Sequence, residues 1–213
     1  MLKSRSCIGA QFKSIDIKTG IDLATLKDLI KMIFASIFAF CMLRQSMAYL
    51  NAYDHDLNFA CPKQTQYVSH VESIHDNHKE DRMFDISCSD VTDDVSDGST
   101  SCFITGHQNQ YDQLLAYECP SNHYISGMYS HHDNRHEDRI WSFRCCEIHD
   151  IHLVDCDYTQ WTNAYDGAQN FHAPADKVMK GVVSVHDNHK EDRQYKYQLC
   201  NAIRGTEPGV VGK

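Results

Sequence analysis

The amino-acid sequence predicts an all-β domain, stapled by disulfides, in which three internal repeats of about 55 residues form a pseudo-threefold arrangement. The octapeptide HDNHKEDR occurs at residues 75–82 and unchanged at residues 186–193, with HDNRHEDR at residues 132–139 between them. Short runs of alternating polar and apolar residues flank each copy, which is typical of half-buried strands. Eight cysteines follow residue 48, an even number that suits a disulfide-bonded secreted domain.

Residues 1–48 are expected to be an N-terminal extension and signal peptide, separate from the domain at residues 49–213. The apolar run at residues 33–43 follows basic residues and precedes the small-x-small sequence SMA, which indicates cleavage after Ala48. This run is about half the ~20 residues that a membrane-spanning helix needs, so a membrane anchor is the weaker alternative. The polar stretch before Met32 suggests that translation starts at Met32.

The expected mature chain is acidic. Residues 1–48 carry seven basic and three acidic residues, so their removal changes the formal net charge from −9 to −13. Nucleic acid is therefore not an expected partner, because its binders need clustered cations. An acidic surface suits cationic partners, including Ca²⁺, basic protein segments and mineral surfaces, or only confers solubility.

A second block of sequence supports the repeats, which we place at about residues 49–98, 107–150 and 161–204. The block reads NAYDHDLNFACP from Asn51, NQYDQLLAYECP from Asn109 and NAYDGAQNFHAP from Asn163. Both blocks recur together at periods of 54 to 58 residues, so chance does not explain them.

Each repeat is expected to contribute two strands joined by its HDN…EDR segment, which we interpret as a long polar hairpin loop. The strands before this segment begin at Tyr67, Tyr124 and Val178. The aromatic residues two positions after each repeat arginine are Phe84, Trp141 and Tyr195, followed two positions later by Ile86, Phe143 and Tyr197. Period two places each such pair on one face of its strand, which predicts the core.

The repeats also limit the pairing of the cysteines. Equivalent positions suggest four disulfides: Cys61–Cys88, Cys119–Cys145, Cys102–Cys146 and Cys156–Cys200. A swap that pairs Cys102 with Cys145 and Cys119 with Cys146 stays open, because Cys145 and Cys146 are adjacent. The third repeat has Ala173 in place of the first cysteine and should lack that bridge. Structural zinc is disfavoured, since no CxxC pair occurs.

The HDN…EDR segments are the candidate ligand-binding loops. The candidate ligand residues are His75, Asp76, Asn77, Glu80, His132, Asp133, Asn134, Glu137, His186, Asp187, Asn188 and Glu191. Such side chains can bind sugar hydroxyls or hold Ca²⁺, and three equivalent loops would give multivalent binding. Zn²⁺ or Cu²⁺ is a further alternative, although the His-x-x-His spacing lapses at Arg135 in the second repeat. The alternative is a purely structural role, in which Asp and Asn only cap turns.

The Asp-Arg pairs and the aromatic residues after them are interpreted as structural. These residues are Asp81, Arg82, Asp138, Arg139, Asp192, Arg193, Phe84, Trp141 and Tyr195. Bidentate hydrogen bonds between arginine and aspartate would lock each segment onto a neighbouring repeat. Catalysis is not expected, because adjacent carboxylates such as Glu80 and Asp81 point apart and the chain has no nucleophile motif, phosphate loop or HExxH.

The repeated motif resembles that of the dermatopontin family. It reads DRMFDISC from Asp81, DRIWSFRCC from Asp138 and DRQYKYQLC from Asp192. The adjacent cysteines of the second copy, the later cysteine of the third, and a Cys-Pro before the first strand are also similar. The resemblance covers residues 49–203, although tryptophan stands at the first aromatic position only in the second copy.

This resemblance implies a secreted, non-enzymatic protein of the extracellular matrix or of cell adhesion, without a cofactor. Its expected partners are glycans or proteoglycans, with collagen and cell-surface glycoproteins as further candidates. One alternative is a soluble invertebrate lectin that agglutinates red cells or aggregates blood cells in defence. Another is an acidic matrix protein of a shell or mineralised tissue.

Overall fold

The computed structural model describes residues 49–92 and 100–205, which confirm the all-β prediction. The strands are β1 (Leu57–Ala60), β2 (Gln66–Asp76), β3 (Asp81–Asp90), β4 (Thr100–Ile104), β5 (Leu115–Glu118), β6 (Tyr124–Asp133), β7 (Asp138–Ile148), β8 (Ile151–Tyr158), β9 (Gln169–His172), β10 (Lys177–Asp187) and β11 (Asp192–Arg204). The expected signal peptide, the start at Met32 and the cleavage after Ala48 lie outside the described residues. Within these ranges, no helix has the length and apolar character to cross a membrane.

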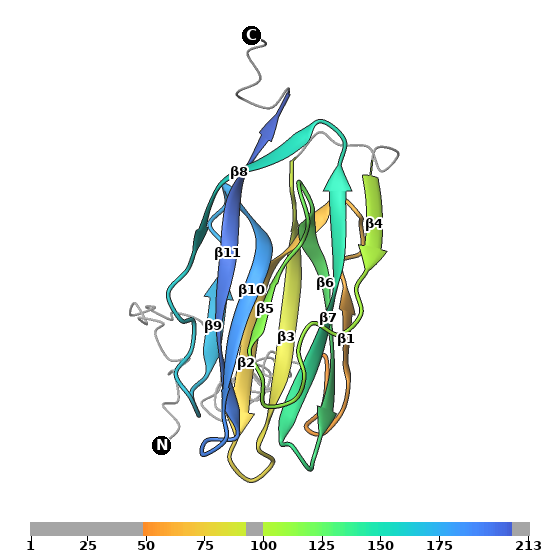
Figure 1. Cartoon of the computed structure of the whole chain (residues 1–213). Helices are drawn as coiled ribbons and strands as arrows, with labels where there is room; N and C mark the ends of the chain where they lie inside the picture. The colour runs from red at the N-terminus through yellow and green to blue at the C-terminus, as the bar shows by residue number, and fades with distance from the viewer. Residues whose placement is uncertain (1–48, 93–99, 206–213) are drawn as a thin grey trace, which may run out of the picture. The chain divides into compact units, whose positions relative to one another are not determined.

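Three long antiparallel hairpins organise the domain: β2–β3, β6–β7 and β10–β11. Their last registered pairs are equivalent: Asp76 with Asp81, Asp133 with Asp138, and Asp187 with Asp192. The three turns lie together at one end of the domain, which is the lower end in Figure 1. The HDN…EDR segments of all three sequence copies therefore gather at this end.

Each sheet combines one hairpin with a short strand from a different repeat. β1 of the first repeat pairs with β6 of the second, and β5 of the second pairs with β10 of the third. β9 of the third repeat pairs back with β2 of the first. β4 and β8 extend two of the sheets by pairing with β7 and β11. The exchange closes into a ring, so each repeat depends on a neighbour for one strand.

An irregularity in each hairpin admits the short strand. The register shifts between Val68 and His70 in β2, between Ile125 and Gly127 in β6, and between Met179 and Gly181 in β10. A Cβ on Gly127 would lie 2.8 Å from the carbonyl oxygen of Phe59 in β1. Glycine therefore allows β1 to approach β6 closely at this bulge.

The aromatic residues predicted for the core meet between the three hairpins. Phe84 and Trp141 are 0% exposed, and Tyr195 is 1% exposed. Their rings contact edge to face, with centroid distances of 5.4 Å for Phe84–Trp141, 5.9 Å for Trp141–Tyr195 and 6.2 Å for Phe84–Tyr195. Each such contact is worth about 0.5–1.5 kcal/mol beyond the burial of area. One residue from each repeat thus builds a shared core layer, which no single repeat can form.

A buried asparagine joins the start of each repeat to its hairpin. Asn109 donates from Nδ2 to the carbonyl oxygen of Arg139, and its Oδ1 accepts from the backbone N–H of Trp141. Asn51 and Asn163 make the same two bonds in the other repeats. These side chains satisfy backbone groups of the hairpin that have no strand beside them. The sequence blocks contained these asparagines, but a bridging role could not be inferred from their spacing.

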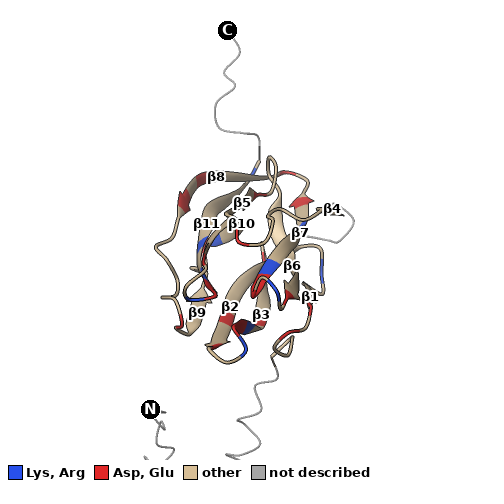
Figure 2. Ribbon diagram, turned by 60° about the horizontal axis from the view of Figure 1, so that its bottom comes forward, with Lys and Arg blue, Asp and Glu red and all other residues tan. Residues whose placement is uncertain are grey.

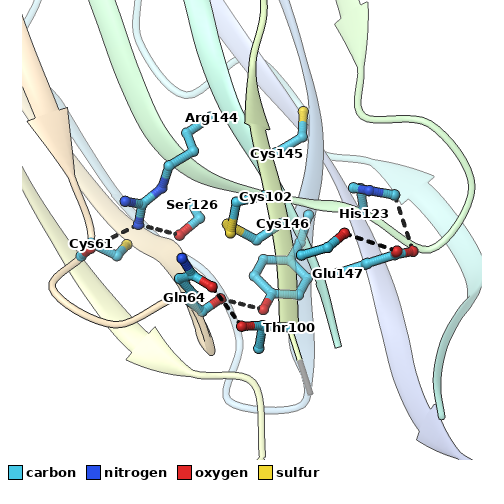
Figure 3. Close-up of a disulfide and its surroundings, with 12 residues drawn as sticks. Cys61, Gln64, Thr100, Cys102, His123, Ser126, Arg144, Cys145, Cys146 and Glu147 are labelled. Carbon is cyan, nitrogen blue, oxygen red and sulfur yellow. Dashed lines mark hydrogen bonds and ion pairs between the residues drawn. A yellow bond between two sulfur atoms is a disulfide. The ribbon is translucent and has the colours of Figure 1, made fainter. Parts of the chain in front are cut away.

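Four disulfides staple the sheets: Cys61–Cys88, Cys102–Cys146, Cys119–Cys145 and Cys156–Cys200. Cys102 faces Cys146 directly in the register of β4 and β7 (Figure 3). Because Cys145 and Cys146 are consecutive in β7, their bridges leave opposite faces of that strand. Nearby, Arg144 donates to the carbonyl oxygen of Cys61 at 2.7 Å and to Oγ of Ser126 at 2.8 Å (Figure 3).

Alkaline titration should separate the buried tyrosines from the others. Burial raises the pKa of Tyr124, Tyr195 and Tyr197. A raised native pKa contributes stability that is fully present below the unfolded pKa, about 10, and is lost as the pH rises further. We expect these three tyrosinates to appear only as the chain unfolds, as monitored by tyrosinate absorbance alongside circular dichroism. Reversible ionisation of all 11 tyrosines in the folded protein would contradict this expectation.

Candidate functional site at the hairpin ends

The HDN…EDR segments are tight turns, so the expectation of long hairpin loops is wrong. β2 continues through Asp76 and β3 begins at Asp81, which leaves only residues 77–80 between them. The strands extend this far because Asp76 and Asp81 still pair across the hairpin. Glu80 closes the turn with φ of 48°, and Glu137 and Glu191 do so with φ of 43° and 44°.

The aspartate of each HDN sequence caps its own turn. Oδ1 of Asp76 accepts backbone hydrogen bonds from His78 at 2.8 Å and Lys79 at 3.2 Å. Asp187 accepts the equivalent pair from His189 and Lys190. In the second repeat, hydrogen bonds from Arg135 lower the pKa of Asp133 to about 2. These carboxylates are thus committed to the turns, as Asp often is.

A ring of buried ion pairs links the three hairpins. Each arginine binds the aspartate of a neighbouring repeat through Nε and one terminal nitrogen: Arg82 binds Asp192, Arg139 binds Asp81 and Arg193 binds Asp138. The six distances lie between 2.6 and 2.8 Å. All six residues are at most 4% exposed. The bidentate geometry fixes both distance and orientation between repeats.

Further hydrogen bonds satisfy these buried charges. In the second repeat, Arg139 also donates to Oγ of Ser130 at 3.0 Å and to the carbonyl oxygen of His55 at 3.0 Å. Oδ2 of its partner Asp81 accepts from the backbone N–H of Asp54 at 2.8 Å. A buried ion pair is tolerated when its remaining donors and acceptors are occupied in this way.

Two opposing effects act on the pKa of Asp192, the third aspartate of the ring. Burial of Asp192 acts to raise its pKa, because it penalises the charged form. The close contact with His75 and the hydrogen bonds from Arg82 outweigh that effect and hold the pKa of Asp192 below its ordinary value. The carboxylate therefore stays ionised and can pair with the arginine.

The three histidines of the HDN sequences point into the domain. The side chains of His75, His132 and His186 are each only 1% exposed. Nδ1 of His132 lies 3.1 Å from Oδ1 of Asn134, and Nδ1 of His186 lies 3.2 Å from Oδ1 of Asn188. Rings with this little exposure are not available to a saccharide at the surface. The sequence pattern groups them with exposed loop residues, since burial of a polar side chain depends on neighbours that are distant in the chain.

The glutamates before each Asp-Arg pair line a small pocket between the hairpin ends. Glu80, Glu137 and Glu191 share this pocket with the arginine–aspartate ring. Burial raises the pKa of Glu137 and of Glu191, and the charge on Glu80 raises both further. The pocket is thus rich in carboxylates that repel one another.

The solvent-facing part of this end consists of three similar polar turns. Their exposed residues are Asn77, His78, Lys79, Asn134, Arg135, His136, Asn188, His189 and Lys190. Acidic and basic segments cluster around the three hairpin ends in Figure 2. Lys79 contacts Asp54 at 3.2 Å, and Lys190 contacts Asp166 at 2.8 Å. The end of the domain therefore presents three polar contact points, each with a basic side chain.

A second surface feature was not identified from the sequence. Tyr158 and Trp161 are 45% and 42% exposed, and Nζ of Lys196 lies 5.2 Å from the centroid of each ring. Exposed aromatic rings of this kind commonly contact partners, because they offer a large apolar face with a polar edge. The one sequence feature that could have pointed to this surface is that Trp161 lies outside the repeated aromatic motif.

Comparison with known proteins gives consistent matches. The family model described as dermatopontin matches residues 51–204. The hemagglutinin/amebocyte aggregation factor of Limulus polyphemus is 39% identical over 166 residues, which cover 77% of this chain and 93% of that protein. Dermatopontin of Biomphalaria glabrata is 33% identical over 153 residues, or 72% of this chain and 99% of that protein. Millepora cytotoxin-1 of Millepora dichotoma is 33% identical over 151 residues, or 71% and 65%. No solved structure matches with significant similarity.

Removal of one arginine from the ring should strongly destabilise the domain. Arg139→Met leaves the buried carboxylate of Asp81 without its bidentate partner, which costs about 3–5 kcal/mol in comparable cases. Equilibrium unfolding in denaturant under non-reducing conditions measures this cost. Arg135→Met is the matched control, because Arg135 is exposed and pairs only at the surface of a turn. Equal, small losses in both variants would show that the ring contributes little.

Proposed function

Since the chain belongs to the dermatopontin family, we propose that it is a secreted adhesion protein that binds saccharides of cell surfaces and aggregates cells. The family and the relatives support an extracellular adhesion or lectin-like role without catalysis. Four disulfides suit an oxidising, extracellular compartment. The finer assignment, to saccharides and to aggregation, is the proposal.

One observation carries the choice of aggregation over matrix assembly. The match to the Limulus hemagglutinin/amebocyte aggregation factor spans 93% of that protein at 39% identity. The similarity thus extends over nearly the whole length of a protein named for agglutination.

The geometry of the hairpin ends supports multivalent contact. The three turns lie at the same end of the domain (Figure 1). The ion-pair ring holds their bases together, so their spacing is fixed before binding. Three weak contacts on one rigid scaffold bind a cell surface far more tightly than one, because the later contacts form intramolecularly. We therefore assign saccharide contact to the exposed turn residues rather than to the buried histidines.

The position of the turns also limits how cells are joined. Three contacts at one end can engage a single cell surface, but aggregation needs a bridge between two surfaces. A second copy of the chain or a second contact surface must provide that bridge. Among the described residues, the exposed aromatic pair Tyr158 and Trp161 offers one such second surface.

Red-cell agglutination by the purified, oxidised protein tests the proposal. We expect agglutination that a competing saccharide from a panel abolishes. The assay is repeated with EDTA to detect a metal requirement. Absence of agglutination by folded protein, together with binding to collagen or glycosaminoglycan, would replace the proposal with a role in matrix assembly. Selective binding to calcium carbonate would instead indicate a mineral matrix.

A pair of variants tests the role of the turns. The double variant His78→Ala with His189→Ala alters two exposed turns and leaves the third intact. Loss of two of three contacts should raise the concentration needed for agglutination by about tenfold or more. The control carries His107→Ala and His149→Ala, which are exposed residues outside the turns. Equal agglutination by both variants would place saccharide contact elsewhere on the domain.

A further inference from the structure

The charges do not balance around the small pocket between the hairpin ends, which we call the axial pocket. The three aspartates and three arginines of the ring neutralise one another in pairs. Three glutamates remain in the same pocket: Glu80, Glu137 and Glu191. With neutral histidines the cluster therefore carries an excess of three negative charges. Clustered, partly desolvated anions favour the binding of a cation.

Two buried histidine nitrogens that have a repeat glutamate beside them lack a hydrogen-bond partner. Among the described residues, Nε2 of His132 and Nε2 of His186 have no hydrogen-bond partner, and each side chain is 1% exposed. An amide oxygen only accepts, so the contact with Asn134 assigns the proton of His132 to Nδ1. The lone pair on Nε2 is then directed at carboxylate oxygens, which are also acceptors. The contact of His186 with Asn188 assigns the same tautomer in the third repeat.

The separations are too long for hydrogen bonds and suit a bridging ion. Nε2 of His132 lies 3.8 Å from Oε2 of Glu137 and 3.8 Å from Oδ1 of Asp81. In the third repeat, Nε2 of His186 lies 3.7 Å from Oε2 of Glu191 and 3.9 Å from Oδ1 of Asp138. Two metal–ligand bonds of about 2.1 Å each can span about 4 Å. Two such bonds can therefore bridge each of these histidine–carboxylate separations.

We infer that two divalent transition-metal sites lie at or beside the axial pocket, one formed by His132, Glu137 and Asp81 and the other by His186, Glu191 and Asp138. Each set joins donors from two repeats, since the aspartate comes from the neighbouring repeat. Water would complete the coordination of each ion, because the side chains of both glutamates are 28% exposed. The inference is independent of saccharide binding.

Outer contacts orient these donors as they do in known metal sites. A metal-binding histidine almost always donates its other N–H to a fixed acceptor, and Asn134 is that acceptor for His132. The carboxylate of Asp81 is held by Arg139, whose Nε lies 2.7 Å from Oδ1. Because this oxygen is shared with a guanidinium, Asp81 is the weakest of the three donors. His132 and Glu137 provide most of the affinity.

The donor chemistry selects the class of metal. Imidazole with carboxylates suits Zn²⁺, Co²⁺ and Ni²⁺, whereas Ca²⁺ and Mg²⁺ prefer sets made only of oxygen. The Ca²⁺ alternative suggested by the sequence therefore does not fit these two sets. In the first repeat both ring nitrogens of His75 also lack a hydrogen-bond partner, but among the described residues His75 makes no ion-pair contact with Glu80, and its Nδ1 lies 3.3 Å from Oδ1 of Asp192 instead. We accordingly assign two sites to the chain rather than three.

Titration of the metal-free, oxidised protein with Co²⁺ tests the inference. We expect two equivalents to bind with visible d–d absorption, which reports coordination by the protein, and we expect Zn²⁺ to displace them. Zn²⁺ should also raise the midpoint of thermal unfolding, because it binds the folded state. Absorption that is absent at saturating Co²⁺ would overturn the inference.

Matched variants separate these sites from adventitious binding to the other histidines of the chain. Glu137→Gln and Glu191→Gln preserve side-chain shape but remove a charged donor, so each should lose one equivalent and the double variant should lose both. Glu118→Gln, an exposed glutamate on β5, is the control and should retain two. Circular dichroism verifies the fold of each variant. Two equivalents retained by the folded double variant would assign the binding to surface histidines and refute the sites.

Discussion

The fold depends on the cyclic arrangement of three arginine–aspartate pairs. Each pair joins two repeats, and the third pair returns to the first repeat, so the ring has no free end. Bidentate contacts at 2.6–2.8 Å leave little freedom of rotation between neighbouring hairpins. The aromatic layer of Phe84, Trp141 and Tyr195 packs directly against this ring, and Arg139 lies 5.9 Å from the centroid of Phe84. Hydrophobic burial and ion pairing thus act close together, because each of these aromatic residues follows a ring arginine by two positions in its strand.

The same ring organises the end of the domain where function is proposed. It brings the glutamates of three repeats into one pocket and orients the histidines inward, while the turn residues beyond it remain in solvent. The exposed turn residues and the buried histidines and pocket glutamates therefore have different chemical environments, although each octapeptide contributes to both groups. Residues three positions apart, such as His75 and His78, consequently have different environments: the first is buried and the second is exposed. The sequence motif alone does not distinguish these two roles.

The strands could be predicted because their signals are local. Period-two alternation predicts both strands of each hairpin, and the cysteines lie at short, corresponding distances from Arg82, Arg139 and Arg193. The exchange of β1, β5 and β9 between repeats could not be predicted, because each short strand is compatible with three equivalent hairpins. The inward orientation of the His132 side chain could not be predicted either, because it depends on Asp81 in another repeat. The bridging role of Asn51, Asn109 and Asn163 could not be predicted either. Each asparagine bonds to hairpin residues that lie 30 to 33 positions later in the chain.

The cyclic strand exchange has a consequence for biosynthesis. β2 obtains its outer partner from β9, and the buried bond between Ser73 and Gln169 joins residues 96 positions apart. At about 5–20 residues per second, the ribosome needs roughly 5–20 s to supply the missing strand. During that interval the first hairpin exposes an open edge that can pair with another chain. Because the ring closes only when its last repeat has emerged, the earliest segment of the domain is the last to be completed.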